Sequence, residues 1–226
     1  IGGVATDPTS YVARVDVAVN GGGFSPATGA LVWAFGVDIP GSGSTLPISV
    51  RAFDAVDNVN SADFNLTLDG VSPNLSVNLN PNEIRRVQRN AQNQWTLQLS
   101  GNATDATAGI ESVTLQIGRS ANQVITPTQI AGDGAWNVTY AFDDIAFNGD
   151  PSPTGVYTLT VTARDNALPD GNPTTQTIPF VIDMTPPTVA MQSHQDDEQI
   201  SDGAVFTGTV QDTFSSVASV DYAFVD

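Results

Sequence analysis

Aspartates at the ends of predicted strands are the residues of this chain that could do chemistry. Each closes an alternating apolar stretch or a repeated motif, and they are Asp69, Asp105, Asp165, Asp183 and Asp212. Carboxylate oxygens are the hard ligands that Ca²⁺ prefers, typically about six to eight in flexible geometry. Aspartate at a strand end also caps the following turn by accepting backbone N–H groups. Turn capping and calcium binding are therefore both open interpretations of these residues.

Other reactive groupings indicate no catalytic site. The chain has no Cys and one His, which excludes disulfides, thiol chemistry and a histidine metal cluster. Asp143 and Asp144 are adjacent, and neighbours on a strand point to opposite faces, so a loop is predicted there rather than an acid/base pair. His194 stands beside an acidic turn, where no Ser-His-Asp arrangement is expected. We expect a chain that is not an enzyme and that holds no catalytic or cofactor-binding residues beyond the candidate calcium ligands.

The composition favours strands and an acidic, solvated surface. Gly, Asp, Asn, Thr and Val are poor helix formers, and we find no segment with a convincing helical pattern. The net charge is −17 and all seven basic residues are Arg. This charge argues against nucleic acid or an anionic membrane surface as a partner. No apolar run is long enough to span a membrane as a helix, so this segment is expected not to insert into one.

A motif that occurs three times shows that the chain is built from repeats. Its copies are Ala5-Thr6-Asp7, Ala103-Thr104-Asp105 and Val210-Gln211-Asp212. Each copy follows a Gly by two residues, and branched aliphatic residues stand five and eight positions after each Asp. Ile48–Asp54 and Leu159–Asp165 form a second repeated element, with the period of a half-buried strand.

These marks predict one complete immunoglobulin-sized unit between two partial ones. Residues 1–72 form a unit without its first strand, residues 73–187 form a complete unit, and residues 188–226 begin a third. The repeat of about 100–115 residues suits a seven-stranded sandwich. The fold class is therefore all-β, with tandem immunoglobulin-like sandwiches of seven to eight strands each, end to end.

The complete unit carries seven stretches with strand-like alternation. They begin near Leu75, Trp95, Ile110, Val124, Trp136, residue 155 and residue 174, and turn-forming clusters separate them. The Arg-rich segment Glu83–Arg89 is interpreted as a loop, with docking of an acidic neighbour as the alternative. Trp33, Trp95 and Trp136 stand in alternating stretches, so core packing is favoured over a sugar site.

Three motifs resemble those of bacterial Ig-like repeats. Residues 155–165, GVYTLTVTARD, resemble the G-x-Y-x-L-x-V-x-A-x-D strand, and residues 183–187, DMTPP, resemble the D-x-T-P-P junction. Residues 103–113 resemble the A-x-D…G-I-x-S-V strand pair. Leu46 stands where the second unit has Tyr157, so a buried Tyr hydroxyl bonded to the backbone is not expected in the first unit. The resemblance implies domains that are strung in tandem in adhesins, surface-layer and filament proteins, and as spacers in secreted enzymes.

In a sandwich of this topology the second and sixth strands run in the same direction. Asp105 and Asp165 are then expected at one pole, where Asp69 of the preceding linker approaches, and Asp183 is expected to combine with Asp212 at the next junction. Calcium at these interdomain positions would remove the repulsion between the carboxylates.

The predicted role is a non-catalytic structural and adhesive segment of a large extracellular bacterial surface or filament protein. Its domains would act as spacers and interaction modules, with neighbouring copies or domains and cell-surface or matrix ligands as partners. Two alternatives are a self-assembling filament or surface-layer subunit completed by strands of a neighbouring chain, and the accessory region of a secreted hydrolase. The expected location is extracellular, at the cell surface.

Overall fold

The computed structural model describes residues 1–38, 43–119, 123–130, 132–142 and 153–223. All regular elements in these residues are strands, as the composition predicts. The chain divides into two compact units. The first comprises Ile1–Pro73, Asp105–Gly109 and Asp165–Asn172, and the second comprises Asn74–Thr104, Ile110–Arg164 and Pro173–Asp226. The predicted boundaries at 72/73 and 187/188 stay a prediction.

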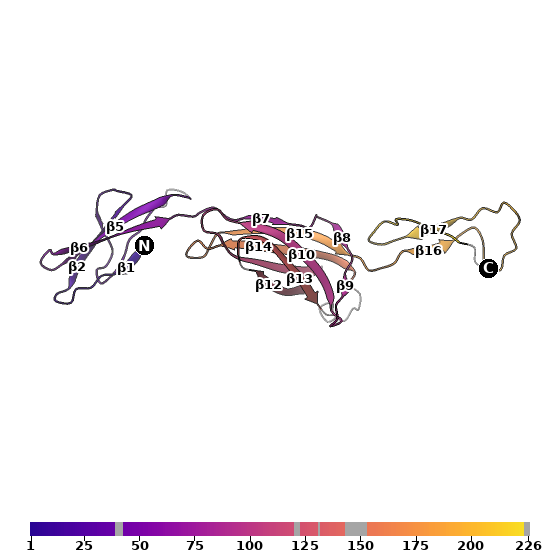
Figure 1. The fold of residues 1–226 in the computed structure, drawn as a ribbon, viewed down its shortest axis with the longest axis horizontal. Helices are drawn as coiled ribbons and strands as arrows, with labels where there is room; N and C mark the ends of the chain where they lie inside the picture. Colours follow the sequence, from indigo (N-terminus) through magenta and orange to yellow (C-terminus); the bar gives the residue numbers. More distant parts are fainter. Residues whose placement is uncertain (39–42, 120–122, 131, 143–152, 224–226) are drawn as a thin grey trace. The chain divides into compact units, whose positions relative to one another are not determined.

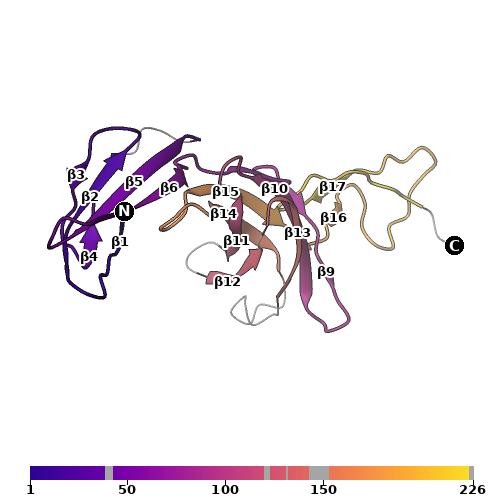
Figure 2. The same ribbon diagram turned by 60° about the vertical axis from the view of Figure 1, so that its left-hand side comes forward.

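The described residues of the first unit form six strands in two sheets, which Figure 2 labels. The strands are β1 (Gly2–Val4), β2 (Val12–Val19), β3 (Ser25–Pro26), β4 (Val32–Ala34), β5 (Thr45–Asp54) and β6 (Val59–Thr67). One sheet has the order β3-β2-β5-β6, and β1 pairs with β4 in the other. Strand β6 therefore forms an edge of the larger sheet.

Alternating side chains of the first unit build a small core. Val15 and Val17 of β2 pack with Leu46, Ile48 and Val50 of β5, because every second residue of a strand points to the same face. Trp33 of β4 completes this core from the other sheet, and Leu68 joins it just after β6. The core prediction for Trp33 is confirmed.

The second unit contains a sandwich of two sheets and a further pair of strands (Figure 1). The sandwich strands are β7 (Asn74–Val77), β8 (Glu83–Arg85), β9 (Gln88–Arg89), β10 (Trp95–Thr104), β11 (Ile110–Arg119), β12 (Gln123–Ile130), β13 (Gly134–Phe142), β14 (Gly155–Asp165) and β15 (Pro173–Ile182). Their orders are β13-β10-β7, with β9 also on β10, and β12-β11-β14-β15-β8. The further pair is β16 (Thr188–Met191) and β17 (Gly208–Gln211).

Both sheets of the sandwich contribute to one buried core. Leu97 and Leu99 of β10 pack with Leu115 of β11, Leu159 of β14 and Phe180 of β15. Trp136 of β13 is also in this core, whereas Trp95 of β10 is partly buried against it. The expectation of core packing is confirmed for Trp136 and in part for Trp95.

Tyr157 marks the difference between the two units that the sequence predicts. Its ring is buried and stacks on Phe180, and its hydroxyl donates a hydrogen bond to the carbonyl oxygen of Pro153 at 2.6 Å. Leu46 of β5 is buried in the first unit and offers no hydroxyl for such a bond.

All seven strands predicted for the complete unit are present, and the structure adds two. The loop interpretation of Glu83–Arg89 is wrong for β8 and β9. Strand β8 pairs in parallel with β15, and β9 pairs with β10. Both strands are too short to show an alternating pattern. The partner of β8 is also distant in sequence, whereas β9 pairs with β10 across a short turn.

Candidate functional site

Three of the five predicted aspartates converge in the first compact unit. One carboxylate oxygen from each of Asp69, Asp105 and Asp165 lies within 4.8 Å of the other two. Asp165 ends β14 and is fully buried, Asp105 directly follows β10, and Asp69 lies two residues after β6. Strand ends thus position all three carboxylates, as the topology predicts for Asp105 and Asp165.

Each of these carboxylates caps the turn that follows it. Oδ1 of Asp105 accepts hydrogen bonds from the backbone N–H groups of Thr107 and Ala108, both at 2.9 Å. Oδ1 of Asp165 accepts them from Ala167 at 3.0 Å and Asn172 at 2.7 Å. The capping interpretation is therefore confirmed. Calcium binding stays a prediction.

Asp69 joins the chain after β6 to both capped loops. Its Oδ2 accepts the N–H of Ala108 at 3.0 Å, and its carbonyl oxygen accepts Nδ2 of Asn172 at 3.3 Å. Nδ2 of Asn172 also donates to Oδ2 of Asp165 at 2.8 Å. Asn166 connects the two loops, since its Nδ2 donates to the carbonyl oxygen of Ala108 at 3.2 Å. Neither asparagine was predicted as a site residue, and their only signal in the sequence was their place in the turn after β14.

Hydrogen bonds favour the ionised form of the Asp105 carboxyl. Burial raises the pKa of Asp105, but hydrogen bonds from the backbone N–H groups of Thr107, Ala108 and Gly109 lower it by more. The pKa of Asp105 therefore lies below its ordinary value. The hydrogen bonds that Asp105 and Asp165 accept come from neutral donors, which do not cancel the charges. Carboxylate oxygens within 4.8 Å of one another repel when they are ionised, and a cation between them would remove this repulsion. Such a set of hard oxygen ligands fits Ca²⁺ better than a metal that prefers nitrogen or sulfur.

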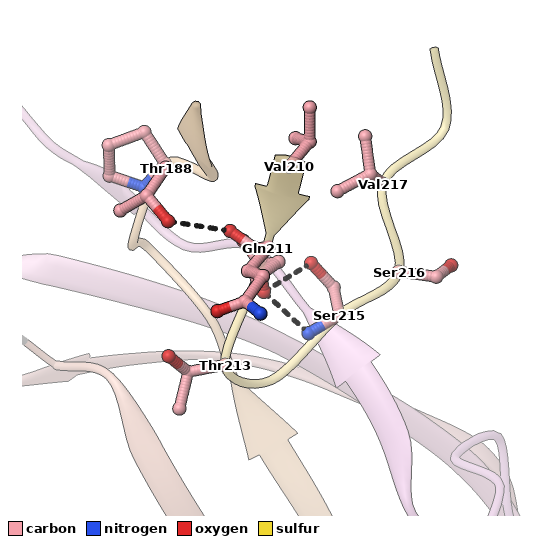
Figure 3. Close-up of a pocket in the computed structure, with 9 residues that line it drawn as sticks. Thr188, Val210, Gln211, Thr213, Ser215, Ser216 and Val217 are labelled. Atoms are coloured by element: carbon pink, nitrogen blue, oxygen red, sulfur yellow. Dashed lines mark hydrogen bonds between the residues drawn. The ribbon is translucent and has the colours of Figure 1, made fainter. Parts of the chain in front are cut away.

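Asp183 and Asp212 lie beside one another in the second unit, as predicted. Oδ1 of Asp212 accepts the N–H groups of Ser215 at 2.7 Å and Phe214 at 3.0 Å. Hydrogen bonds from the N–H groups of Ser215 and Phe214 lower the pKa of Asp212, and burial opposes them only in part. Asp212 borders a pocket that is also lined by Pro186, Thr188 and Val217 (Figure 3). Among the described residues, only Asp69, Asp105 and Asp165 bring three possible metal-ligand side chains together.

Asp7 and Asp54, which were not predicted as site residues, form a third pair with the same local geometry. Asp7 caps its turn through the N–H groups of Ser10 at 2.6 Å and Thr9 at 2.8 Å, and Asp54 caps through Asn58 and Val56. The charge of Asp7 raises the pKa of Asp54, but the side chain of Asn58 lowers it more. Asp7 ends the first copy of the repeated motif, and that position could have identified it.

The remaining candidates have local partners or lie outside the described residues. Arg85 pairs with Glu83 at 2.7 Å, and the guanidinium of Arg89 lies 4.2 Å above the centre of the Trp95 ring. His194 lies 3.2 Å from Glu198, in an exposed turn. Asp143 and Asp144 fall outside the residues that the structure describes.

Residues 141–221 match the family model of the bacterial Ig-like domain (group 3). This segment runs from the last strands of the predicted complete unit into the first strands of the next. No curated protein sequence matches the chain. No helix in the described residues is long and apolar enough to cross a membrane.

Several solved structures are similar at low sequence identity. Fibronectin(III)-like modules of CbhA from Clostridium thermocellum share 15% identity with a TM-score of 0.46, over 79% of this chain and 82% of theirs. A tetra-tandem repeat in the extending region of a large adhesion protein shares 22% identity with a TM-score of 0.35, over 85% and 46%. A 1.5-MDa bacterial ice-binding adhesin shares 18% identity with a TM-score of 0.36, over 87% and 62%.

The matched segment and the two-sheet sandwich agree with the motifs of the sequence. The chain is an all-β protein with an immunoglobulin-like fold, and it resembles the bacterial Ig-like repeat domains through residues 141–221.

Proposed function

We propose that this chain is a non-catalytic structural and adhesive segment of a large extracellular bacterial surface or filament protein. Its Ig-like domains act as spacers and interaction modules, for which stiffness and surface matter more than a catalytic pocket. The family match supports this role, because Ig-like domains are typically structural modules. The acidic composition supports a location outside the cell.

One observation carries the proposal. The carboxylates of Asp69, Asp105 and Asp165 converge, and Asp69 hydrogen-bonds to the two loops that hold the other carboxylates. The backbone that follows β6 is therefore bonded to two loops. It has less conformational freedom than a linker without such hydrogen bonds. We propose that Ca²⁺ binds this group, removes the repulsion between the carboxylates and stiffens the segment.

The test is thermal unfolding of the chain in calcium, in magnesium and in chelator. Binding raises stability by about 1.4 kcal/mol at a calcium concentration ten times the dissociation constant. We expect a rise in Tm of about 3–6 °C in calcium, because 1 kcal/mol shifts the Tm of a chain of this size by about 2–4 °C. Affinities of extracellular calcium modules suggest that millimolar calcium is needed.

Matched variants separate site binding from charge screening. Asp105→Asn and Asp69→Asn keep an acceptor oxygen for the capped turn but remove a charged ligand, so the calcium-dependent rise should be lost. Asp63→Asn removes an exposed charge from the middle of β6 and should keep the full rise. An equal rise in all three variants, or none in the parent chain, would reject calcium binding at this group.

Two alternative roles stay predictions. One is a self-assembling filament or surface-layer subunit completed by strands of a neighbouring chain, and the other is an accessory region of a secreted hydrolase.

A further inference from the structure

The chain enters and leaves the sandwich of β7–β15 through neighbouring strands. It enters at β7, continues through β8, and leaves from the end of β15. Tension along the chain therefore pulls on the start of β7 and on the end of β15. The way in which these strands are joined decides how the sandwich responds to that tension.

The entering and leaving segments lie side by side and run in the same direction. Strand β8 pairs in parallel with β15, with Phe180 opposite Glu83. Nε2 of Gln176, in the first half of β15, donates to the carbonyl oxygen of Leu75 in β7 at 2.7 Å. The start of the entering segment thus lies beside the first half of β15, and its end lies beside the end of β15 (Figure 1).

Backbone hydrogen bonds close both ends of the β8–β15 pair. The N–H of Asn82 donates to the carbonyl oxygen of Pro179 at 2.7 Å, and the N–H of Asp183 donates to that of Arg85 at 2.9 Å. Hydrogen bonds between strands bridge the gap between neighbours and do not run along the strand axis. A displacement of β8 along its own axis therefore strains all the bonds of the pair together.

The entering segment is also anchored in the core and on the other sheet. Leu75, Leu79 and Val87 are buried in the core of the sandwich. Strand β7 pairs with β10, where Leu75 lies opposite Ala103. A segment that slides must draw these side chains through close-packed surroundings and expose apolar surface to water. The entering segment is therefore attached to both sheets of the sandwich.

We propose that the segments Leu75–Arg85 and Gln176–Asp183 form a mechanical clamp, which resists tension between the two ends of the sandwich. Tension pulls the start of the first segment and the end of the second in opposite directions. Because the segments are parallel, they must slide past one another, and the clamp fails only when its bonds break together. The inference rests on the proposed role as a structural segment, since a spacer transmits load between the domains that it connects.

The same strands would open easily if they were pulled apart from one end. In that geometry the terminal pair bears nearly all the force and breaks before the next pair is loaded. Arg86 directly follows β8 and Pro187 follows β15, so both positions lie beyond the same end of the paired strands. The resistance of a clamp thus depends on the direction of pulling, whereas stability against heat or urea has no direction.

Single-molecule pulling on the whole chain tests the clamp, because a chain without natural Cys accepts cysteine attachment points at chosen positions. Ser72→Cys with Pro187→Cys loads the clamp in the sliding geometry, and Arg86→Cys with Pro187→Cys loads it in the opening geometry. All three positions are exposed. A released contour length of roughly 400 Å identifies unfolding between residues 72 and 187, at about 3.5 Å per residue.

The unfolding forces of the two geometries are compared at one pulling speed and in chelator. We expect the force to be several-fold higher in the sliding geometry, since forced unfolding is governed by the barrier to unfolding and not by the equilibrium stability. A force in the sliding geometry that is no higher than in the opening geometry would overturn the proposal.

Two matched variants separate the clamp from general stability. Gln176→Met removes the hydrogen bond to Leu75 with little change in side-chain volume, and it should lower the unfolding force in the sliding geometry only. Gln98→Met changes an exposed residue of β10 outside the clamp and should leave both forces unchanged. Circular dichroism checks that the variants are folded. An equal loss of force in both geometries for Gln176→Met would also contradict the clamp.

The outcome is independent of the calcium test of the proposed function. The forces are measured in chelator, so a sandwich without a clamp leaves the calcium-dependent rise in Tm unaffected. A chain that binds no calcium still shows the difference between the two pulling geometries if the clamp exists.

Discussion

The glycine that precedes each copy of the repeated motif lies where a side chain has no room. A Cβ at Gly101 would collide with the carbonyl oxygen of Ser76 and with the indole ring of Trp136, whose Cε2 would lie 2.7 Å away. A Cβ at Gly3 would lie 2.9 Å from the ring of Trp33. The repeated spacing revealed these glycines in the sequence. Their reason was not readable, because the atoms that exclude a side chain come from other strands.

Gly101→Ala should therefore destabilise the second unit by about 1–3 kcal/mol, the usual cost of inserting a methylene into a packed region. Urea unfolding monitored by tryptophan fluorescence measures the change. Gly36→Ala is the matched control, since a Cβ there meets nothing within 4 Å. A Gly101→Ala chain as stable as the Gly36→Ala chain would show that the neighbouring atoms move aside freely.

At the scale of elements, long alternating strands were predictable and short ones were not. Strand β14 alternates over eleven residues, and the side chains of Tyr157, Leu159 and Val161 are buried as its pattern indicates. Strand β8 has three residues and draws its stability from a parallel partner almost a hundred positions later. The segment Glu83–Val87, which contains β8, faces the core on one side only: Val87 is buried and Ile84 is exposed.

Val87→Ala should cost about 2 kcal/mol of stability, from lost burial and the cavity that remains. Ile84→Ala removes more atoms from an exposed position of the same segment and should cost less than about 0.5 kcal/mol. Thermal or urea unfolding of the two variants ranks them. The reverse ranking would mean that Glu83–Val87 does not pack as a strand of the sandwich.

At the scale of the whole molecule, capped aspartates recur with the repeat. Topology alone predicted that Asp105 and Asp165 would meet, because strands of the same direction end at the same pole. The participation of Asn166 and Asn172 was not predictable, since side-chain hydrogen bonds depend on loop conformations that no periodicity encodes. Because the capping recurs, many carboxylates stabilise the fold in their ionised form, and all of them lose this contribution as the pH falls.

The pKa values of Asp7, Asp54, Asp105 and Asp212 all lie below the ordinary value of 3.8, since backbone and side-chain donors stabilise the ionised forms. A carboxyl whose pKa is lower folded than unfolded stabilises the fold above the unfolded pKa, and this contribution disappears as pH falls through the folded pKa. Tm should therefore change little between pH 7 and pH 5 and fall steeply below about pH 4.

Differential scanning calorimetry across this range measures the effect, and Asp105→Asn should show a shallower fall because one of the titrating caps is gone. General relief of the −17 charge acts in the opposite direction, since protonation reduces repulsion and would raise Tm on acidification. The sign of the change below pH 4 thus decides whether local capping or overall charge governs the acid stability of the chain. A rising Tm would contradict the capping argument at all four aspartates.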